Sequence, residues 1–200
     1  MISQLDSLSS LASQHAHAIE CKFLQSRDSY QPCHILAPDV DQRLSAIYVD
    51  NQFYSFFKAI PDPRKVLDVI VRLGKRDDKV AVTFTKRGFA IWVHEPGAHY
   101  APPRQKPTHS IQPVFGPKPC LVVTEAEAYQ TCQIQVPDMA KPLSAISYRG
   151  RYYSIFKQEE DAGRLIEIGA KLTQRGDDIL IAMASSSHIL ALLEPSGKLI

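Results

Sequence analysis

The chain has 200 residues, with 23 Lys and Arg against 21 Asp and Glu, so its net charge at neutral pH is only +2. Hydrophobic residues make up 44% and charged residues 22%, which is typical of a folded globular protein and argues against wholesale disorder. No run of 18 apolar residues is present, so no membrane-spanning helix is predicted. The near-neutral balance by itself indicates neither a nucleic-acid nor a membrane partner.

Residues 1–20 contain Ile2, Leu5, Leu8 and Leu11 at a spacing of three, which predicts either a short amphipathic helix or an N-terminal tail. This segment has no early Lys or Arg and no continuous apolar stretch, so it does not resemble a secretory signal. Four cysteines in the whole chain are too few for a disulfide scaffold. We therefore expect a cytoplasmic protein.

Short runs of apolar and β-branched residues follow, separated by polar turns, and they predict strands. The four predicted strands cover residues 21–25, 31–36, 44–49 and 52–58. Between the last two lies Asp50-Asn51, and Asn at the second loop position tolerates the positive φ of a tight type I′ hairpin.

A helix is predicted to begin at Asp62-Pro63, with Asp as the N-cap and Pro in the first helical position. Its apolar stripe consists of Val66, Val69, Ile70 and Leu73, and Gly74 follows as a terminator. Two further strands are predicted at 79–85 and 89–94. This order indicates an α+β unit, in which one helix covers one face of an antiparallel sheet.

Residues 99–119 form a proline-rich basic linker, with six of the fourteen prolines, three basic residues (Arg104, Lys106 and Lys118) and no acid. Such a segment is predicted to be extended and semi-rigid, and at about 3.1 Å per residue it spans up to roughly 60 Å. It would serve as a spacer between domains, or alternatively dock to a proline-recognising groove on a partner.

An internal repeat decides the architecture. Residues 21–98 align without a gap with residues 120–197, at a constant offset of 99, with 21 identities in 78 positions. Average composition would give only about five identities. The segment LSAIYVDNQFYSFFK at 44–58 matches LSAISYRGRYYSIFK at 143–157. We predict a tandem duplication of a ββββαββ module, and call 21–98 the first module and 120–197 the second module.

The strands at 44–58 are apolar on both faces, which indicates burial on both sides and predicts that the modules pack as a pseudo-two-fold pair. The first module has 12 Lys and Arg against 9 Asp and Glu, whereas the second has 7 against 10. This asymmetry fits solvated charged faces, complementary docking of the modules, or binding of an acidic partner or nucleic acid.

The four cysteines obey the offset of 99. Cys21 and Cys33 flank a turn centred on residue 27, so a simple hairpin would place them opposite one another, and Cys120 and Cys132 would pair in the same way. Such pairs would be small buried side chains, or a disulfide in an oxidising compartment. A zinc site would require all four to meet, and no metal site is predicted.

Residues that differ between the modules are freer to carry a specific function. This set comprises Lys86, Arg87, Trp92 and His94, which align with Ser185, Ser186, Ala191 and Leu193. An exposed Trp beside basic groups would suit an interface anchor or a base-stacking platform, and the alternative is that Trp92 is buried between the modules. No phosphate-binding loop, metalloprotease motif or nucleophile elbow is present, so no cofactor and no catalytic residue is predicted.

We therefore expect a non-enzymatic binding or assembly protein that engages a macromolecular partner, in the first instance a protein, through the first module. The predicted partner-binding residues are Lys86, Arg87, Trp92, His94, Arg104 and Lys106. A single-stranded nucleic-acid-binding protein is the alternative. A small-molecule or enzymatic site between the modules is a third interpretation. The sequence predicts no oligomeric state.

Overall fold

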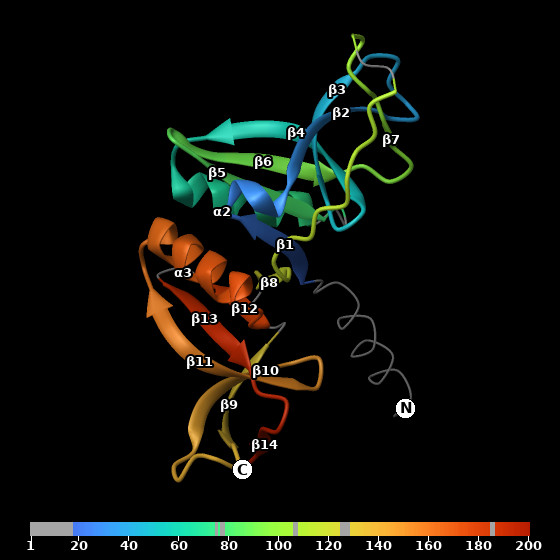
Figure 1. The fold of residues 1–200 in the computed structure, drawn as a ribbon. Helices are drawn as coiled ribbons and strands as arrows, with labels where there is room; N and C mark the ends of the chain where they lie inside the picture. Colours follow the sequence, from blue (N-terminus) through green and yellow to red (C-terminus); the bar gives the residue numbers. More distant parts are fainter. Residues whose placement is uncertain (1–17, 75, 77–78, 106–107, 125–128, 185–186) are drawn as a thin grey trace, which may run out of the picture.

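The computed structural model describes residues 18–200 except 75, 77–78, 106–107, 125–128 and 185–186. The amphipathic helix predicted within residues 1–20 therefore falls almost entirely outside the described residues. In the described part, fourteen strands form one mixed sheet and two α-helices pack on it (Figure 1). Neither helix is long and apolar enough to cross a membrane.

The first module and the residues beside it contain seven strands, a short 3-10 helix and one α-helix. Their bounds are β1 Ile19–Leu24, η1 Arg27–Ser29, β2 Gln31–Leu36, β3 Leu44–Val49, β4 Gln52–Ile60, α2 Pro63–Gly74, β5 Val80–Thr85, β6 Gly88–His94 and β7 His99–Tyr100. Four strands, a helix and two strands follow in the predicted order. The two-residue strand β7 was not predicted.

The second module follows the same order of elements. Their bounds are β8 Cys120–Val123, β9 Gln130–Gln135, β10 Leu143–Tyr148, β11 Arg151–Glu159, α3 Ala162–Gln174, β12 Ile179–Met183, β13 His188–Leu193 and β14 Lys198–Leu199. In space the sheet runs β7-β2-β3-β4-β6-β5-β1 and then continues β8-β12-β13-β11-β10-β9-β14. Corresponding strands thus occupy corresponding places on either side of the central β1–β8 pair.

The predicted all-antiparallel sheet is wrong at two places. Strand β1 pairs with β5 in parallel, and β8 pairs with β12 in parallel. The cause lies in the connections, because parallel neighbours require a crossover across the face of the sheet, usually by a helix. The chain leaves β1 for the β2–β3–β4 arm, and α2 then carries it back over the sheet face before β5 begins.

The tight hairpin predicted at Asp50-Asn51 is confirmed, and the second module has the same hairpin at the matching position. Asp50 and Asn51 both have positive φ, at 49° and 59°, between β3 and β4. Arg149 and Gly150, with φ of 49° and 72°, make the same turn between β10 and β11. Two successive left-handed residues match the right-handed twist of the flanking strands.

The helix cap predicted at Asp62 is also confirmed. The Asp62 carboxylate accepts a hydrogen bond from the backbone N–H of Arg64 at 3.0 Å, which satisfies a free donor in the first turn of α2. The Asp161 carboxylate does the same for α3, accepting from the N–H groups of Gly163 at 2.8 Å and Arg164 at 3.2 Å.

The largest hydrophobic cluster joins the two modules. It contains fully buried side chains from the central strand β1, such as Phe23, from α2, such as Ile70, and from α3, such as Leu165. The two helices lie side by side on one face of the sheet, near its middle (Figure 1). Two smaller clusters lie elsewhere among the described residues, one around Ile47 and Tyr54 in the first module and one around Ile146 and Tyr153 in the second. The modules therefore share one core.

The proline-rich linker packs back onto the first module at both of its ends. Its first residues form β7, which pairs with β2, and the N–H of Ala101 donates to the carbonyl of His34 at 2.9 Å. Near its end, the carbonyl of Val114 accepts from the N–H of Asp50 at 2.8 Å. Backbone hydrogen bonds thus hold the described part of the linker against the first module at both ends.

Candidate binding surface of the first module

A groove of about 420 Å³ opens between the end of β4 and one face of α2. Its lining residues are Lys58, Ala59, Ile60, Pro61, Lys65, Asp68, Val69 and Arg72. The four helical residues are spaced i, i+3, i+4 and i+7, so they project from the same side of α2. Ile60 is 5% exposed and belongs to the main core, so the floor of the groove is firmly packed.

Three cations and one acid line this groove, which gives it a net charge of +2. Lys58, Lys65 and Arg72 are all exposed. Within the described residues, none of these three cations takes part in an ion pair. The charge of the groove is therefore available to an external anion.

The matching positions of the second module are neutral overall. Residues 99 positions later are Lys157, Gln158, Glu159, Glu160, Arg164, Glu167, Ile168 and Lys171, with three cations and three acids. The Glu159 carboxylate pairs with the Lys157 ammonium at 2.9 Å and with the Arg164 guanidinium at 3.4 Å. The hydrogen bond from Lys157 is the main reason why the pKa of Glu159 is lowered. Ile60 replaces this carboxylate in the first module.

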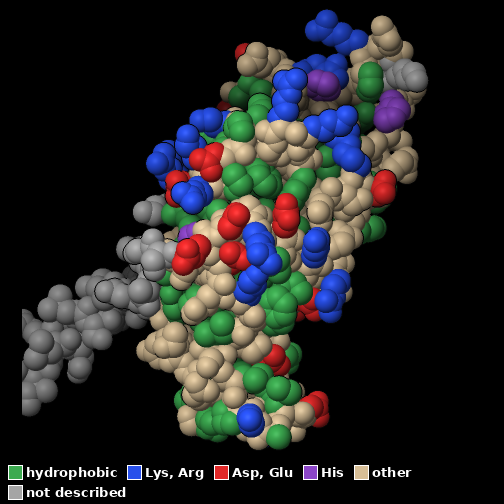
Figure 2. All heavy atoms as spheres, turned by 90° about the vertical axis from the view of Figure 1, so that its left-hand side faces the viewer, with side chains coloured by type: hydrophobic (Ala, Val, Ile, Leu, Met, Phe, Trp, Pro, Cys, Tyr) green, Lys and Arg blue, Asp and Glu red, His purple; other side chains and the backbone are tan. Residues whose placement is uncertain are grey.

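The turn between β5 and β6 extends the basic surface. Gly88 has φ of 123°, and a Cβ added there would lie 2.5 Å from the Cα of Pro61, so this turn lies against the end of the groove. The exposed Lys86 and Arg87 precede Gly88 in the same turn. Figure 2 shows Lys and Arg side chains gathered over the upper part of this side of the molecule, which the first module forms.

Two phenylalanines of β4 remain at the surface. Phe56 is 46% and Phe57 51% exposed, and the pairing with β6 shifts register between Phe56 and Lys58. Phe57 is the extra residue of this β-bulge and so has no partner on β6. The prediction that this hairpin is buried on both faces is therefore wrong for β4.

Trp92 packs within the first module. Its indole N–H donates to the Thr83 hydroxyl at 2.9 Å, and its ring meets Phe56 edge-on with the centroids 5.3 Å apart. The indole also packs against the small core cluster that includes Ile47 and Tyr54. It is half-buried, but it does not lie between the modules, and Thr83 already satisfies its polar group.

The predicted partner-binding residues that the structure describes do not form one surface. Lys86 and Arg87 lie before β6, whereas His94 lies at its far end, about 20 Å away at 3.3 Å per residue. The His94 ring is 5.4 Å from that of Tyr54, and burial, helped by the charge of Lys79, lowers its pKa. Arg104 is exposed in the linker, and Lys106 lies outside the described residues.

The predicted pairing of the cysteines is wrong. Cys21 lies opposite Cys120 across the β1–β8 pair, while Cys33 lies on β2 opposite Ala46. The hairpin assumption fails because β1 and β2 are not neighbours in the sheet. Cys132 lies on β9, so the four thiols do not meet. Among the described residues, no three His, Cys, Asp or Glu side chains gather as a metal site would require.

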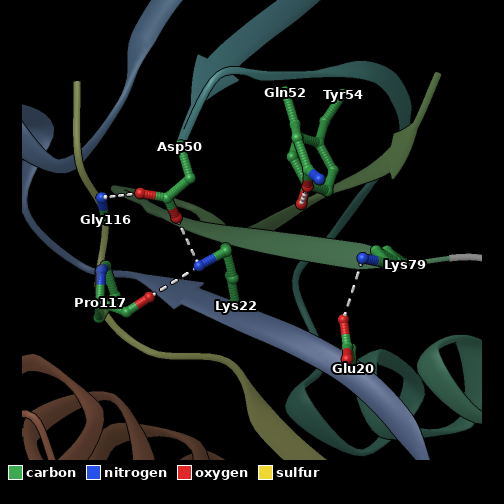
Figure 3. A network of polar contacts seen from close by, with 8 residues as sticks. All are labelled: Glu20, Lys22, Asp50, Gln52, Tyr54, Lys79, Gly116 and Pro117. Carbon is green, nitrogen blue, oxygen red and sulfur yellow. Dashed lines mark hydrogen bonds and ion pairs between the residues drawn. The ribbon is translucent and has the colours of Figure 1, made fainter. Parts of the chain in front are cut away.

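A second, smaller cavity of about 210 Å³ lies where the linker crosses the first module. Its charged groups pair with one another (Figure 3): the Lys22 ammonium lies 2.6 Å from the Asp50 carboxylate and donates to the carbonyl of Pro117 at 2.9 Å. The other Asp50 oxygen accepts from the N–H of Gly116 at 3.0 Å. This network fixes the linker, and its charges are already compensated.

Comparison with known proteins adds no family to this picture. No protein-family model, no curated protein and no solved structure matches the chain.

The sequence analysis missed Lys58, Lys65 and Arg72 as a group. Lys58 lies on β4, whereas Lys65 and Arg72 lie two helical turns apart on α2, and only the packing of α2 beside β4 brings them together. One signal was present in the alignment of the two modules, since Ile60 stands where the second module has the carboxylate of Glu159.

Proposed function

We propose that the chain is a tandem duplication whose modules form a pseudo-two-fold pair, and that it acts as a non-enzymatic binding protein whose first module holds a protein partner. The arrangement of the sheet supports the first part. Cys21 and Cys120 correspond at the offset of 99 and lie opposite each other, so an axis through this pair would exchange the two modules.

The observation that carries the binding role is the surface around β4. Phe56 and Phe57 are exposed on β4, the strand that also contributes Lys58 to a groove lined by unpaired cations. Large exposed apolar groups rimmed by charge mark interaction sites, and aromatic residues with nearby cations are the usual anchors of protein interfaces. In the second module Ile155 replaces Phe56, and two of the three matching cations, Lys157 and Arg164, pair with Glu159.

A protein partner fits this surface better than a nucleic acid. Trp92, the obvious base-stacking group, is held by Thr83 and by the core of the first module. The walls of the groove between its cations are aliphatic, formed by Ile60, Pro61 and Val69. The lining of the groove offers no aromatic face for base stacking, whereas its aliphatic side chains suit an apolar side chain of a protein.

The test compares two matched variants of the full chain as bait for cell extract, followed by mass spectrometry. Phe57→Ser removes an aromatic side chain that is 51% exposed, and Phe156→Ser removes its counterpart, which is 53% exposed. We expect Phe57→Ser to reduce recovery of a specific protein about tenfold or more, as at an interface anchor, and Phe156→Ser to leave it unchanged.

Equal recovery by both variants and by the unaltered protein would contradict the proposal. Retention of nucleic acid in place of protein, with affinity that falls steeply as salt rises, would instead support the nucleic-acid alternative.

A further inference from the structure

The groove between β4 and α2 has a definite chemical pattern, and we infer that it binds an extended acidic segment of the partner, with carboxylates at both ends of the contact and an aliphatic residue between them. This inference rests on the proposed function and names the partner's chemistry. The first module would then recognise a short linear motif rather than a folded surface.

The positions of the cations set the spacing of the carboxylates. Lys65 and Arg72 lie two helical turns apart on the same face of α2, which separates their Cα atoms by about 10 Å along the helix axis. In an extended peptide at about 3.3 Å per residue, this distance separates residues three positions apart. Lys58 stands across the groove on β4, where it adds a third positive charge.

Asp68 determines which kind of residue the partner segment can place at the middle of the groove. It is the one acid in the lining, and it follows Lys65 by one helical turn, between the two cations of α2. A carboxylate placed centrally would meet like charge, which disfavours binding. An uncharged apolar residue there instead meets Val69, Ile60 and Pro61. The order acid–apolar–acid is therefore favoured over a continuous acidic run.

The second module supplies an internal comparison. Its matching positions carry the same number of cations, but Glu159 forms ion pairs with Lys157 and Arg164. With Glu160 and Glu167, the three acids bring the net charge of these positions to zero. An acidic segment that approached this surface would compete with Glu159, a carboxylate of the same chain, for Lys157 and Arg164. Among the described residues, the groove of the first module has a net charge of +2, whereas the matching surface of the second module has no net charge.

The experiment measures binding of fluorescent synthetic peptides to the full chain by anisotropy. The first peptide has two Glu residues, then Leu-Val, then two Glu residues, flanked by Gly and Ser. The second has Gln in place of every Glu. The third has the same composition as the first but with all acids in the centre and the apolar residues at the ends. An oligo-dT strand of similar length is the nucleic-acid probe.

We expect the first peptide to bind at least about tenfold more tightly than the second, and more tightly than the third. Lys65→Gln with Arg72→Gln should weaken its binding about tenfold. Arg164→Gln with Lys171→Gln is the matched control, because it removes the same net charge from the corresponding helix face; it should leave binding within about twofold. Amide chemical shifts of the unaltered chain should change at residues 58–61 and 65–72.

Equal binding of the Glu and Gln peptides, equal weakening by the two double variants, or shift changes confined to other strands would overturn the inference. Preference for oligo-dT over all peptides would also overturn it. The proposed function is tested separately: a cellular protein that depends on Phe57 but not on Lys65 and Arg72 would preserve the function and refute the acidic motif.

Discussion

Cys21 on β1 lies directly opposite Cys120 on β8, at the point where the two modules join in one sheet. Both side chains are fully buried in the main core, and burial raises the pKa of each thiol, with the charge of Cys21 adding to the effect at Cys120. A thiol in such surroundings is a weak nucleophile, because the reactive thiolate is disfavoured. The junction between the modules is therefore an apolar contact rather than a reactive pair.

We predict that alkylation of the native protein separates the four cysteines into two classes. Cys33 and Cys132 are partly exposed, although burial raises the pKa of both, to about 12 for Cys33. They should react slowly at about pH 8, and Cys21 and Cys120 should react only after unfolding. Mass spectrometry of iodoacetamide-treated protein, with and without denaturant, measures this order. Fast native labelling of Cys120 would contradict the shared core.

The Lys22–Asp50 pair should tie the linker to the first module. Asp50→Asn keeps an acceptor for the Gly116 N–H and tolerates the positive φ, but it leaves the Lys22 ammonium without its carboxylate. Lys22 is 13% exposed in its side chain, so we expect a loss of about 1–3 kcal/mol in unfolding free energy, between the values for surface and buried pairs.

Urea denaturation measures this loss, and hydrogen exchange locates it. The Gly116 amide should exchange faster in Asp50→Asn, while the amides of β11 in the second module stay unchanged. Arg149→Gln is the comparison variant, because Arg149 aligns with Asp50 and lies in the corresponding turn of the second module, between β10 and β11. Uniformly faster exchange throughout the chain would indicate global destabilisation rather than release of the linker.

Local structure was predictable because it depends on neighbours in the chain. Asp50-Asn51 supplied a turn with two positive φ values, and Asp62 supplied a cap whose hydrogen bond is present. Both features follow from side-chain chemistry within a few residues. The alternation of apolar residues likewise located the strands to within a few residues.

Strand partners and the groove were not predictable in the same way. Cys21 and Cys33 are close in sequence, yet β1 finds its neighbours in β5 and β8, because the main core beneath α2 and α3 favours that placement. The cations of the groove come from β4 and α2, and no local sequence pattern predicts how these two elements pack against each other. Only Lys86 and Arg87, at the edge of the groove, stood out in the sequence, because Ser185 and Ser186 take their places in the second module.

Gly88 should be among the least replaceable residues of the first module. Its φ is 123°, and a Cβ there would lie 2.5 Å from the Cα of Pro61, so backbone has to move. We expect Gly88→Ala to cost about 2–4 kcal/mol in unfolding free energy. Gly150→Ala is the control, with φ of 72° and nothing within 4 Å, and should cost only about 1 kcal/mol. Equal losses in urea denaturation would show that backbone conformation alone matters and that the contact with Pro61 does not.

The stability of the protein should fall between neutral and mildly acidic pH because of two histidines. Burial lowers the pKa of His94 and of His188, with Lys79 reinforcing the shift at His94, while Glu95 and Asp68 respectively oppose it. Each imidazole is therefore neutral in the folded state at a pH where the unfolded chain already binds a proton. The full stability is present above the ordinary value of 6.5 and is lost as pH falls toward the folded pKa.

This window is separate from that of Glu159, whose lowered pKa makes its contribution disappear below the ordinary value of 4.5. Urea denaturation at several pH values, with His94→Leu plus His188→Gln as the variant, tests the assignment. The variant should show a flatter dependence of unfolding free energy on pH around 6 and an unchanged loss below about pH 4.5. An undiminished slope in the variant near pH 6 would mean that other groups titrate there.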